Sequence, residues 1–227
     1  MHPNPAFRTA SRDENLAFAR ARGFGVLSVN GPDGPIAAHV PFLLSADASF
    51  AEVHLARSNP LARACQADAP LPALIAVSGP DAYVSPDWYG VEDQVPTWNY
   101  VAVHLRGRLD PLPEDALRGH VDALSAEHEA RLLPKVPWVS DKMSEGAMPR
   151  MLRMILPFRL QINSIEGTWK LNQNKTDAVR MAAADQLAQQ NDTGAQAIAR
   201  LMRDCSLLQG ASLTAAMRAK PARLARC

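Results

Sequence analysis

The chain has 227 residues, with 24 basic and 23 acidic side chains and a formal net charge of +1. This length is enough for one large domain with a real core, and the balanced charge argues against sequence-independent DNA binding through the field of the whole molecule. Cys65, Cys205 and Cys227 follow no metal spacing, so we expect free thiols in a reducing compartment, although an odd cysteine could pair between chains. No apolar run reaches membrane-spanning length and no signal-peptide core is present, so the sequence predicts a cytoplasmic protein with no membrane segment.

The chain opens with a helix and a hairpin. Ser11-Arg-Asp-Glu14 has the form of a capping box and predicts the start of a short helix. Strands are expected over 24–29 and 36–43, joined by a turn at Asn30-Gly-Pro-Asp-Gly34. Pro41 places the second strand at an edge or an end of its sheet, because proline cannot donate to a ladder.

A further helix and more strands follow. Asn59 can cap a helix that Pro60 begins and that ends near Cys65. The pattern predicts strands over 50–55, over 71–77 (closed by Gly79-Pro80) and over 98–106.

Helices dominate the second half. An amphipathic helix is expected over 113–129, a strand over 158–165, and two helices over 176–190 and 194–208. The last helix carries an apolar stripe, made of Ile198, Leu201, Met202, Cys205 and Leu208. Strands that are interrupted and followed by helices indicate an α+β protein with a mostly antiparallel sheet, closed into a barrel.

Aromatic side chains gather in one short region. All three tyrosines and two of the four tryptophans lie between Tyr83 and Tyr100, among prolines and hydroxyl side chains. A core strand does not need this composition, whereas a site that stacks a flat ring does. The region is therefore the first candidate for a ligand site.

Two segments are suited to an anion. Arg57-Ser-Asn-Pro60 and Lys170-Leu-Asn-Gln-Asn-Lys175 each place a cation and polar side chains ahead of a predicted helix, where free N–H groups favour phosphate. Each segment on its own also fits a simple helix cap with a solvated cation. Both readings stay open from the residues alone.

Other polar residues lie on strands. Thr97 and Asn99 share an apolar strand face, either as hydrogen-bonded core residues or as groups presented to a heterocycle. His39, His54 and His104 also have apolar neighbours, and a lone strand histidine is most often structural. No metal motif, nucleophile elbow, phosphate loop or complete dinucleotide fingerprint occurs, so nothing nominates a catalytic side chain.

Four phrases resemble a known family. They are His54-Leu-Ala-Arg-Ser-Asn-Pro60, Gly79-Pro-Asp-Ala-Tyr-Val-Ser-Pro-Asp-Trp-Tyr89, Val95-Pro-Thr-Trp-Asn-Tyr-Val-Ala-Val-His104 and Glu166-Gly-Thr-Trp-Lys-Leu-Asn-Gln-Asn174. In this order they are similar to the PaiB-type family, FMN-binding proteins named as negative transcriptional regulators and related in fold to pyridoxamine-phosphate oxidase. The likeness runs from about Phe7 to about Gln190.

The resemblance implies an antiparallel split β-barrel, a homodimer and FMN at the subunit interface. We expect an FMN-binding barrel domain over 1–175, helices packed on the barrel over 176–209, and a disordered basic tail over 210–227. Two positions depart from the family pattern, Ala38 where an asparagine is frequent and Asn172 where a serine is frequent. These departures would weaken FMN binding or change the ligand.

The resemblance also assigns roles to residues. His39 and Val40 would line the flavin, and Arg57, Ser58 and Asn59 would hold the ribityl phosphate. Thr97, Trp98 and Asn99 would border the isoalloxazine ring, with Tyr83 and Ser85 nearby. The pocket would be closed, from the same subunit or from its partner, by Lys170, Gln173 and Asn174.

Three functions fit this picture. The first is a flavin-binding regulator that represses transcription directly or through a partner. Direct DNA binding rests only on the family's naming, since the sequence shows no helix-turn-helix and its basic patch is confined to the tail. A flavin-dependent oxidoreductase with a nicotinamide donor needs no catalytic side chain, because the flavin supplies the chemistry. A haem-binding relative of the same barrel would use His39, His54 or His104 as axial ligand.

Overall fold

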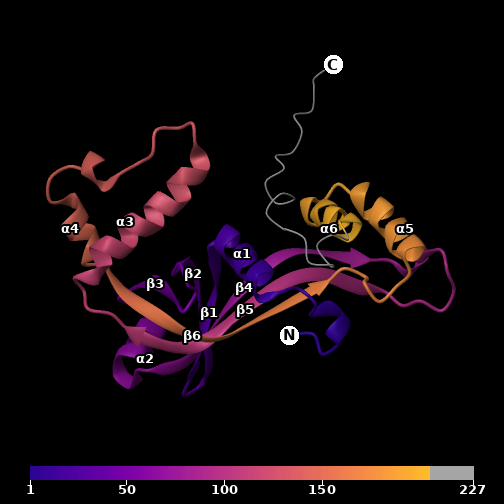
Figure 1. Ribbon diagram of the computed structural model, residues 1–227. Helices are drawn as coiled ribbons and strands as arrows, with labels where there is room; N and C mark the ends of the chain where they lie inside the picture. Colours follow the sequence, from indigo (N-terminus) through magenta and orange to yellow (C-terminus); the bar gives the residue numbers. More distant parts are fainter. Residues whose placement is uncertain (205–227) are drawn as a thin grey trace. The chain divides into compact units, whose positions relative to one another are not determined.

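The computed structural model describes residues 1–204, with Asp68 described by its backbone alone (Figure 1). The chain forms two compact units. We call Ala19–Val77 with His104–Ile165 the barrel unit, and Met1–Phe18 with Ser78–Val103 and residues 166–204 the helical unit. The predicted tail, and the predicted positions of Cys205 and Leu208, lie outside the described residues. The expected division of the chain at residues 175 and 209 stays a prediction.

Six antiparallel strands close a barrel in the order β1-β2-β3-β6-β5-β4. All six contribute to the barrel unit, and the later parts of β4 and β6 and the first part of β5 belong to the helical unit. Their bounds are β1 (Phe24–Gly31), β2 (Gly34–Leu44), β3 (Phe50–Ala56), β4 (Leu71–Val84), β5 (Thr97–Pro111) and β6 (Ile155–Lys170). The predicted α+β split barrel is confirmed.

Alternating side chains build the barrel core. On β2, Ala38, Val40 and Phe42 are buried while His39 is exposed, as the period-two pattern predicts. The ladder between β1 and β2 ends at the pair Phe24–Pro41, and the ladder between β2 and β3 begins at Phe42. Pro41 therefore lies at an end of a ladder, and β2 is not an edge strand.

The strands are longer than predicted. β4 does not stop at Gly79-Pro80 but continues to Val84. A Cβ added at Gly79 would lie 2.8 Å from the Phe18 ring and 2.9 Å from Val101 Cβ, so glycine here permits close packing rather than ending the strand. The prediction that this strand ends at Gly79-Pro80 was therefore wrong.

Helices cover the barrel unit. Asn59 caps α2 (Pro60–Asp68) by accepting a hydrogen bond from Leu61 N at 2.9 Å, as predicted. α2 packs against β1 and β2, and α3 (Ala116–Glu129) packs against β2 and β3. Two 3₁₀ turns and α4 (Ala147–Leu152) follow. Cys65 on α2 is a buried free thiol, and burial raises its pKa to about 11.

The helical unit holds a pair of helices and the start of α1 (Arg12–Arg22). The predicted capping box forms, because Glu14 N donates to Ser11 Oγ at 3.2 Å and Ser11 N donates to Glu14 Oε2 at 2.6 Å. α5 (Asp177–Ala188) and α6 (Thr193–Arg203) lie side by side (Figure 1). The buried face of α6 consists of Ala195, Ile198, Ala199 and Met202. Within residues 1–204, no helix is both long enough and apolar enough to span a bilayer.

Candidate functional site

The segment Arg57–Asn59 lies where β3 leads into α2, in the barrel unit. The Arg57 guanidinium donates to the backbone carbonyl of Arg153 at 2.7 Å and to Glu114 Oε2 at 2.5 Å. The hydrogen bond from Arg57 lowers the pKa of Glu114, and the charge of Arg57 adds to this effect. Arg57 therefore already has a carboxylate partner, and Asn59 is used as a helix cap.

Two predicted residues of the same unit lie on β2. His39 is exposed, and its ring stacks near Phe24 with centroids 6.4 Å apart and an interplanar angle of 29°. Val40 is only 1% exposed and points into the barrel core. A ligand can meet the side chain of His39, but only the backbone of Val40.

In the helical unit, Tyr83 and Trp98 are exposed, whereas Tyr89 of the same aromatic region is buried. Tyr83 and Trp98 are 48% and 55% exposed, and their rings meet edge to face at 6.3 Å. Ser85 caps the 3₁₀ turn η2 (Pro86–Tyr89) by accepting a hydrogen bond from Asp87 N at 3.3 Å. The two rings supply apolar faces of the kind that stack on a heterocycle.

Lys170 and Lys175 are two cationic residues of this unit. Lys170 Nζ donates to Thr97 Oγ1 and lies 5.8 Å from the centre of the Phe7 ring. Lys175 Nζ lies 4.2 Å from the centre of the Tyr89 ring. Burial, and to a lesser extent the charge of Lys175, lowers the pKa of Lys170.

The turn between the two lysines is tightly hydrogen-bonded. Gln173 accepts from Leu171 N at 2.7 Å and donates to the carbonyl of Trp169. Asn172 adopts a φ of 63°, the left-handed region that asparagine tolerates better than most residues. Its amide donates to the Tyr89 hydroxyl at 3.4 Å, so the asparagine that departs from the family pattern has a structural role here. Asn174 is exposed.

Asn99 is a buried polar residue of β5. Its side chain is fully buried, and Nδ2 donates to Met202 Sδ at 3.3 Å while Oδ1 has no hydrogen-bond partner among residues 1–204. Strand alternation turns Asn99 toward α6 and turns Trp98 the other way. The amide of Asn99 faces the interior of the helical unit, the hydrogen-bonded core position that the sequence left open, and its predicted contact with the flavin stays a prediction.

A histidine pair was not found from sequence. His54 Nδ1 and His120 Nε2 lie 3.1 Å apart, and His120 Nδ1 is 3.6 Å from Glu52 Oε2. Arg159 holds the same carboxylate at 2.5 Å. The signal was the position of His120, three residues after Leu117 and therefore on the buried face of α3.

The predicted cofactor residues fall into two groups. His39, Val40 and the segment 57–59 belong to the barrel unit, and the others belong to the helical unit. Within the helical unit the structure joins Thr97 to Lys170 and Tyr83 to Trp98. Within the barrel unit it joins Arg57 to Glu114, a residue that no motif singled out.

Comparisons with known proteins fit this fold. A family model with the description "Putative FMN-binding domain" matches residues 1–164. The Bacillus subtilis (strain 168) protein named protease synthase and sporulation protein PAI 2 is 31% identical over 200 residues, which cover 87% of this chain and 94% of that protein.

Two solved structures show the same fold at low sequence identity. The FAD and heme binding protein from Mycobacterium smegmatis has a TM-score of 0.51 and 18% identity, over 72% of this chain and 73% of that chain. The flavocytochrome Anf3 from Azotobacter vinelandii has a TM-score of 0.50 and 16% identity, over 74% and 72% of the two chains. The family match and the PAI 2 relative show that this chain belongs to the PaiB-type family of FMN-binding split-barrel proteins.

Proposed function

We propose that this protein is a homodimer that binds FMN and represses transcription, directly or through a partner protein. Family membership supports the cofactor and the regulatory role. The observation that carries the proposal is the pair Lys170 and Lys175, which have no carboxylate within ion-pair distance among residues 1–204. Partly buried cations without a counter-ion favour an anionic ligand.

The side chains present fit FMN. A phosphate monoester needs charged donors, which Lys170 and Arg57 offer, and an isoalloxazine ring needs flat apolar faces, which Tyr83 and Trp98 offer. Because Thr97 and Trp98 point to opposite faces of β5, Lys170 and the Trp98 ring would contact different parts of the ligand or different ligands. FMN, when bound, supplies electron-transfer chemistry, and these residues bind and orient it.

Exposed apolar side chains support the homodimer. Between α3 and α4, five of them lie close together in sequence and are 36–75% exposed: Leu132, Leu133, Val136, Trp138 and Val139. Runs of this kind are typical of protein–protein contacts. We expect light scattering to give a dimer, and a monomer that still binds FMN tightly would contradict the proposal.

Absorption spectroscopy tests the cofactor. Protein incubated with FMN and freed of excess should keep a bound flavin spectrum, whereas a Soret band would indicate haem. Loaded protein that oxidises reduced nicotinamide with steady turnover would favour the oxidoreductase over the regulator. A regulator instead predicts altered transcript levels when the gene is deleted, with no such turnover.

Arg57→Ala tests the phosphate assignment. Loss of a charge-assisted hydrogen bond costs about 1.5–3 kcal/mol, and the existing pair with Glu114 places the expected loss of FMN affinity at the low end, roughly tenfold. The affinity can be measured by quenching of flavin fluorescence. Unchanged affinity would remove Arg57 from the site.

A further inference from the structure

Lys170, the last residue of β6, carries a half-buried amine whose contacts are neutral groups. Its Nζ donates to Thr97 Oγ1 and lies 5.8 Å from the centre of the Phe7 ring. Phe7 is 3% exposed, so its ring shields this side of the amine from water. Among residues 1–204, no carboxylate lies within ion-pair distance of Lys170. The charged form of Lys170 is therefore held without a counter-ion.

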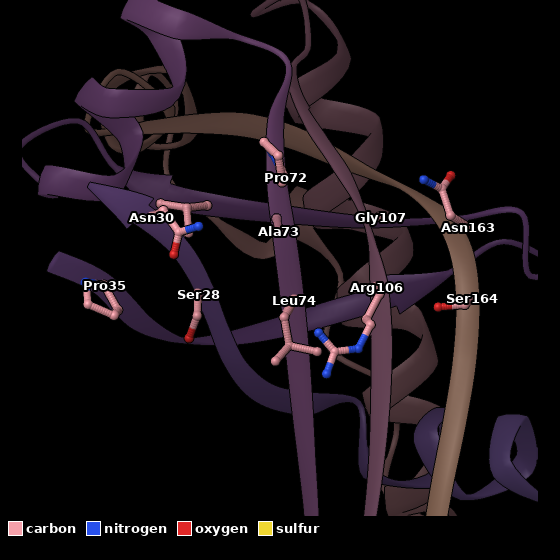
Figure 2. A pocket seen from close by; sticks show the side chains of 11 residues that line it. Ser28, Asn30, Pro35, Pro72, Ala73, Leu74, Arg106, Gly107, Asn163 and Ser164 are labelled. Carbon is pink, nitrogen blue, oxygen red and sulfur yellow. The ribbon is translucent and has the colours of Figure 1, made fainter. Parts of the chain in front are cut away.

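The charge in the open groove of the barrel unit is held differently (Figure 2). The groove has a volume of about 500 Å³, and Arg106 of β5 is the charged member among the described residues that line it. Figure 2 shows its side chain between Leu74 on β4 and Ser164 on β6. Arg106 already interacts with another residue, and a guanidinium keeps its proton in proteins. The groove therefore offers neither a free cation nor an amine, whereas Lys170 offers an amine without a counter-ion.

Lys175 adds a second positive charge close to Lys170. Its Nζ donates to the side-chain carbonyl of Gln94 and lies 4.2 Å from the centre of the Tyr89 ring, and both partners are neutral. No carboxylate in the described part of the chain lies within ion-pair distance of Lys175 either. Burial, followed by the charge of Lys175, lowers the pKa of Lys170. The cluster therefore attracts anions, and it favours the neutral amine of Lys170 more than water does.

The neutral form of a lysine side chain is a nucleophile. Its lone pair attacks carbonyl carbons, and lysines that are desolvated or lie next to another cation are the ones that form imines in proteins. The hydrogen bond from Nζ to Thr97 Oγ1 holds the amine of Lys170 in place. The Thr97 hydroxyl keeps its own proton, which it can donate to the oxygen of a carbonyl compound. Lys170 thus has the setting of a reactive lysine, and Lys175 provides a charge that selects the carbonyl compound.

We propose that Lys170 forms an imine with a small aldehyde or ketone that carries an anionic group. The lone pair of Nζ attacks the carbonyl carbon, a C=N bond replaces the C=O bond, and the carbonyl oxygen leaves as water with the two protons of the neutral amine. No electrons are transferred to or from another group. Lys175 pairs with the anionic group of the ligand. The reaction goes beyond the proposed function, because it shares Lys170 with the flavin site but does not require FMN.

Reductive trapping of the full-length protein tests the proposal. The protein is incubated, without FMN, with pyruvate and sodium cyanoborohydride, which reduces an imine to a stable amine, and the adducts are mapped by peptide mass spectrometry. The other lysines of the chain are internal controls, namely Lys135, Lys142, Lys175 and Lys220. Lys170 should be labelled at least about tenfold faster than each of them. Equal labelling, or faster labelling of another lysine, overturns the proposal.

Further probes and variants separate the amine from the anion site. Propanal has no anionic group and should label Lys170 with less preference over the other lysines, and lactate has no reactive carbonyl group and should give no adduct. Lys175→Gln should slow labelling by pyruvate about tenfold more than labelling by propanal, because only pyruvate loses an ionic partner. Thr97→Val should slow both probes, and Thr97→Ser, which keeps the hydroxyl, should not. Equal slowing of the two probes in Lys175→Gln overturns the anionic ligand.

FMN affinity, measured separately, keeps this proposal apart from the proposed function. Selective labelling of Lys170 in protein that does not bind FMN would support the imine and contradict the flavin site. Unselective labelling in protein that binds FMN would do the reverse. If both activities are present, saturating FMN should protect Lys170 from pyruvate, because the phosphate of FMN and the anionic group of the ligand compete for the same cations.

Discussion

Two cationic segments that look alike in sequence differ in charge balance. In the barrel unit, Arg57 is 2.5 Å from Glu114, an ion pair that is complete without a ligand. In the helical unit, Lys170 donates to the neutral hydroxyl of Thr97, and Lys175 donates to the amide of Gln94. Across the part of the chain that the structure describes, neither lysine has a carboxylate partner.

This difference in charge balance changes the free energy that an anion gains by binding at each segment. An anion near Arg57 must share the guanidinium with Glu114, so part of its attraction is offset by like-charge repulsion. Burial and the charge of Lys175 lower the pKa of Lys170, which means that the charged form of Lys170 is held at a cost in free energy. A bound anion would reduce this cost. We therefore expect the lysine segment to contribute more to anion affinity than Arg57.

The largest expected effect is on the stability of the fold around α3, the helix that follows Glu114. This residue stands two positions before α3, and α3 is held to β3 by the His120–His54 contact. Burial, followed by the charge of His54, lowers the pKa of His120 from 6.5 to about 4. The unfolded chain takes up this proton near pH 6.5 and the folded chain only near pH 4. Neutral His120 therefore stabilises the fold fully above pH 6.5, and this stability is lost as the pH falls toward 4.

Urea unfolding at several pH values measures this loss. The shift corresponds to about 3 kcal/mol of unfolding free energy. His120→Leu removes this group and should reduce the pH dependence between 6.5 and 4, and the part that remains is assigned to His54, whose pKa is also lowered by burial. Equal slopes in the variant and the parent protein would show that another group causes the acid sensitivity.

Lys170→Met is expected to have the next largest effect. The variant removes a half-buried ammonium group that has no carboxylate partner within residues 1–204. FMN affinity should fall by about tenfold to a hundredfold, a larger loss than Arg57→Ala causes. Fluorescence titration measures the affinity. Arg203→Met, which removes a cation already paired with Asp185 in the same unit, is the control and should leave affinity unchanged. A loss no larger than that of Arg57→Ala would contradict the comparison between the two segments.

Sequence patterns predicted the barrel because each signal acts locally. Alternation along β2, the capping box of Ser11 and Glu14 and the Asn59 cap depend on residues a few positions apart, and all three are confirmed. The end assigned to β4 at Gly79-Pro80 was wrong because a glycine that permits a close approach and a glycine that ends a strand look the same in sequence.

The site was harder to predict because its partners are distant along the chain. Glu114 is 57 residues from Arg57, and Met202 is 103 residues from Asn99. Neither pairing has a local signature, since each depends on which helix covers which strand. The family resemblance supplied roles for Arg57 and Asn99, but it contained no information about the carboxylate and the thioether that meet them here.

The smallest expected effect on FMN affinity is that of Glu114→Gln, which tests the role of the ion pair at Arg57. The amide keeps the size of the side chain and removes its charge, so Arg57 becomes an unpaired cation like Lys170. FMN affinity should rise modestly, by less than Arg57→Ala lowers it, because both groups are partly exposed and solvent screens them. The gain should vanish when the substitution is made in Arg57→Ala protein, since no cation is then released. Asp185→Asn, which frees Arg203 in the helical unit, is the control and should leave affinity unchanged. If Glu114→Gln instead lowers FMN affinity, the carboxylate of Glu114 orients Arg57 for the phosphate. The two segments then differ in how their cations are held in position, and not in how much positive charge they leave for a ligand.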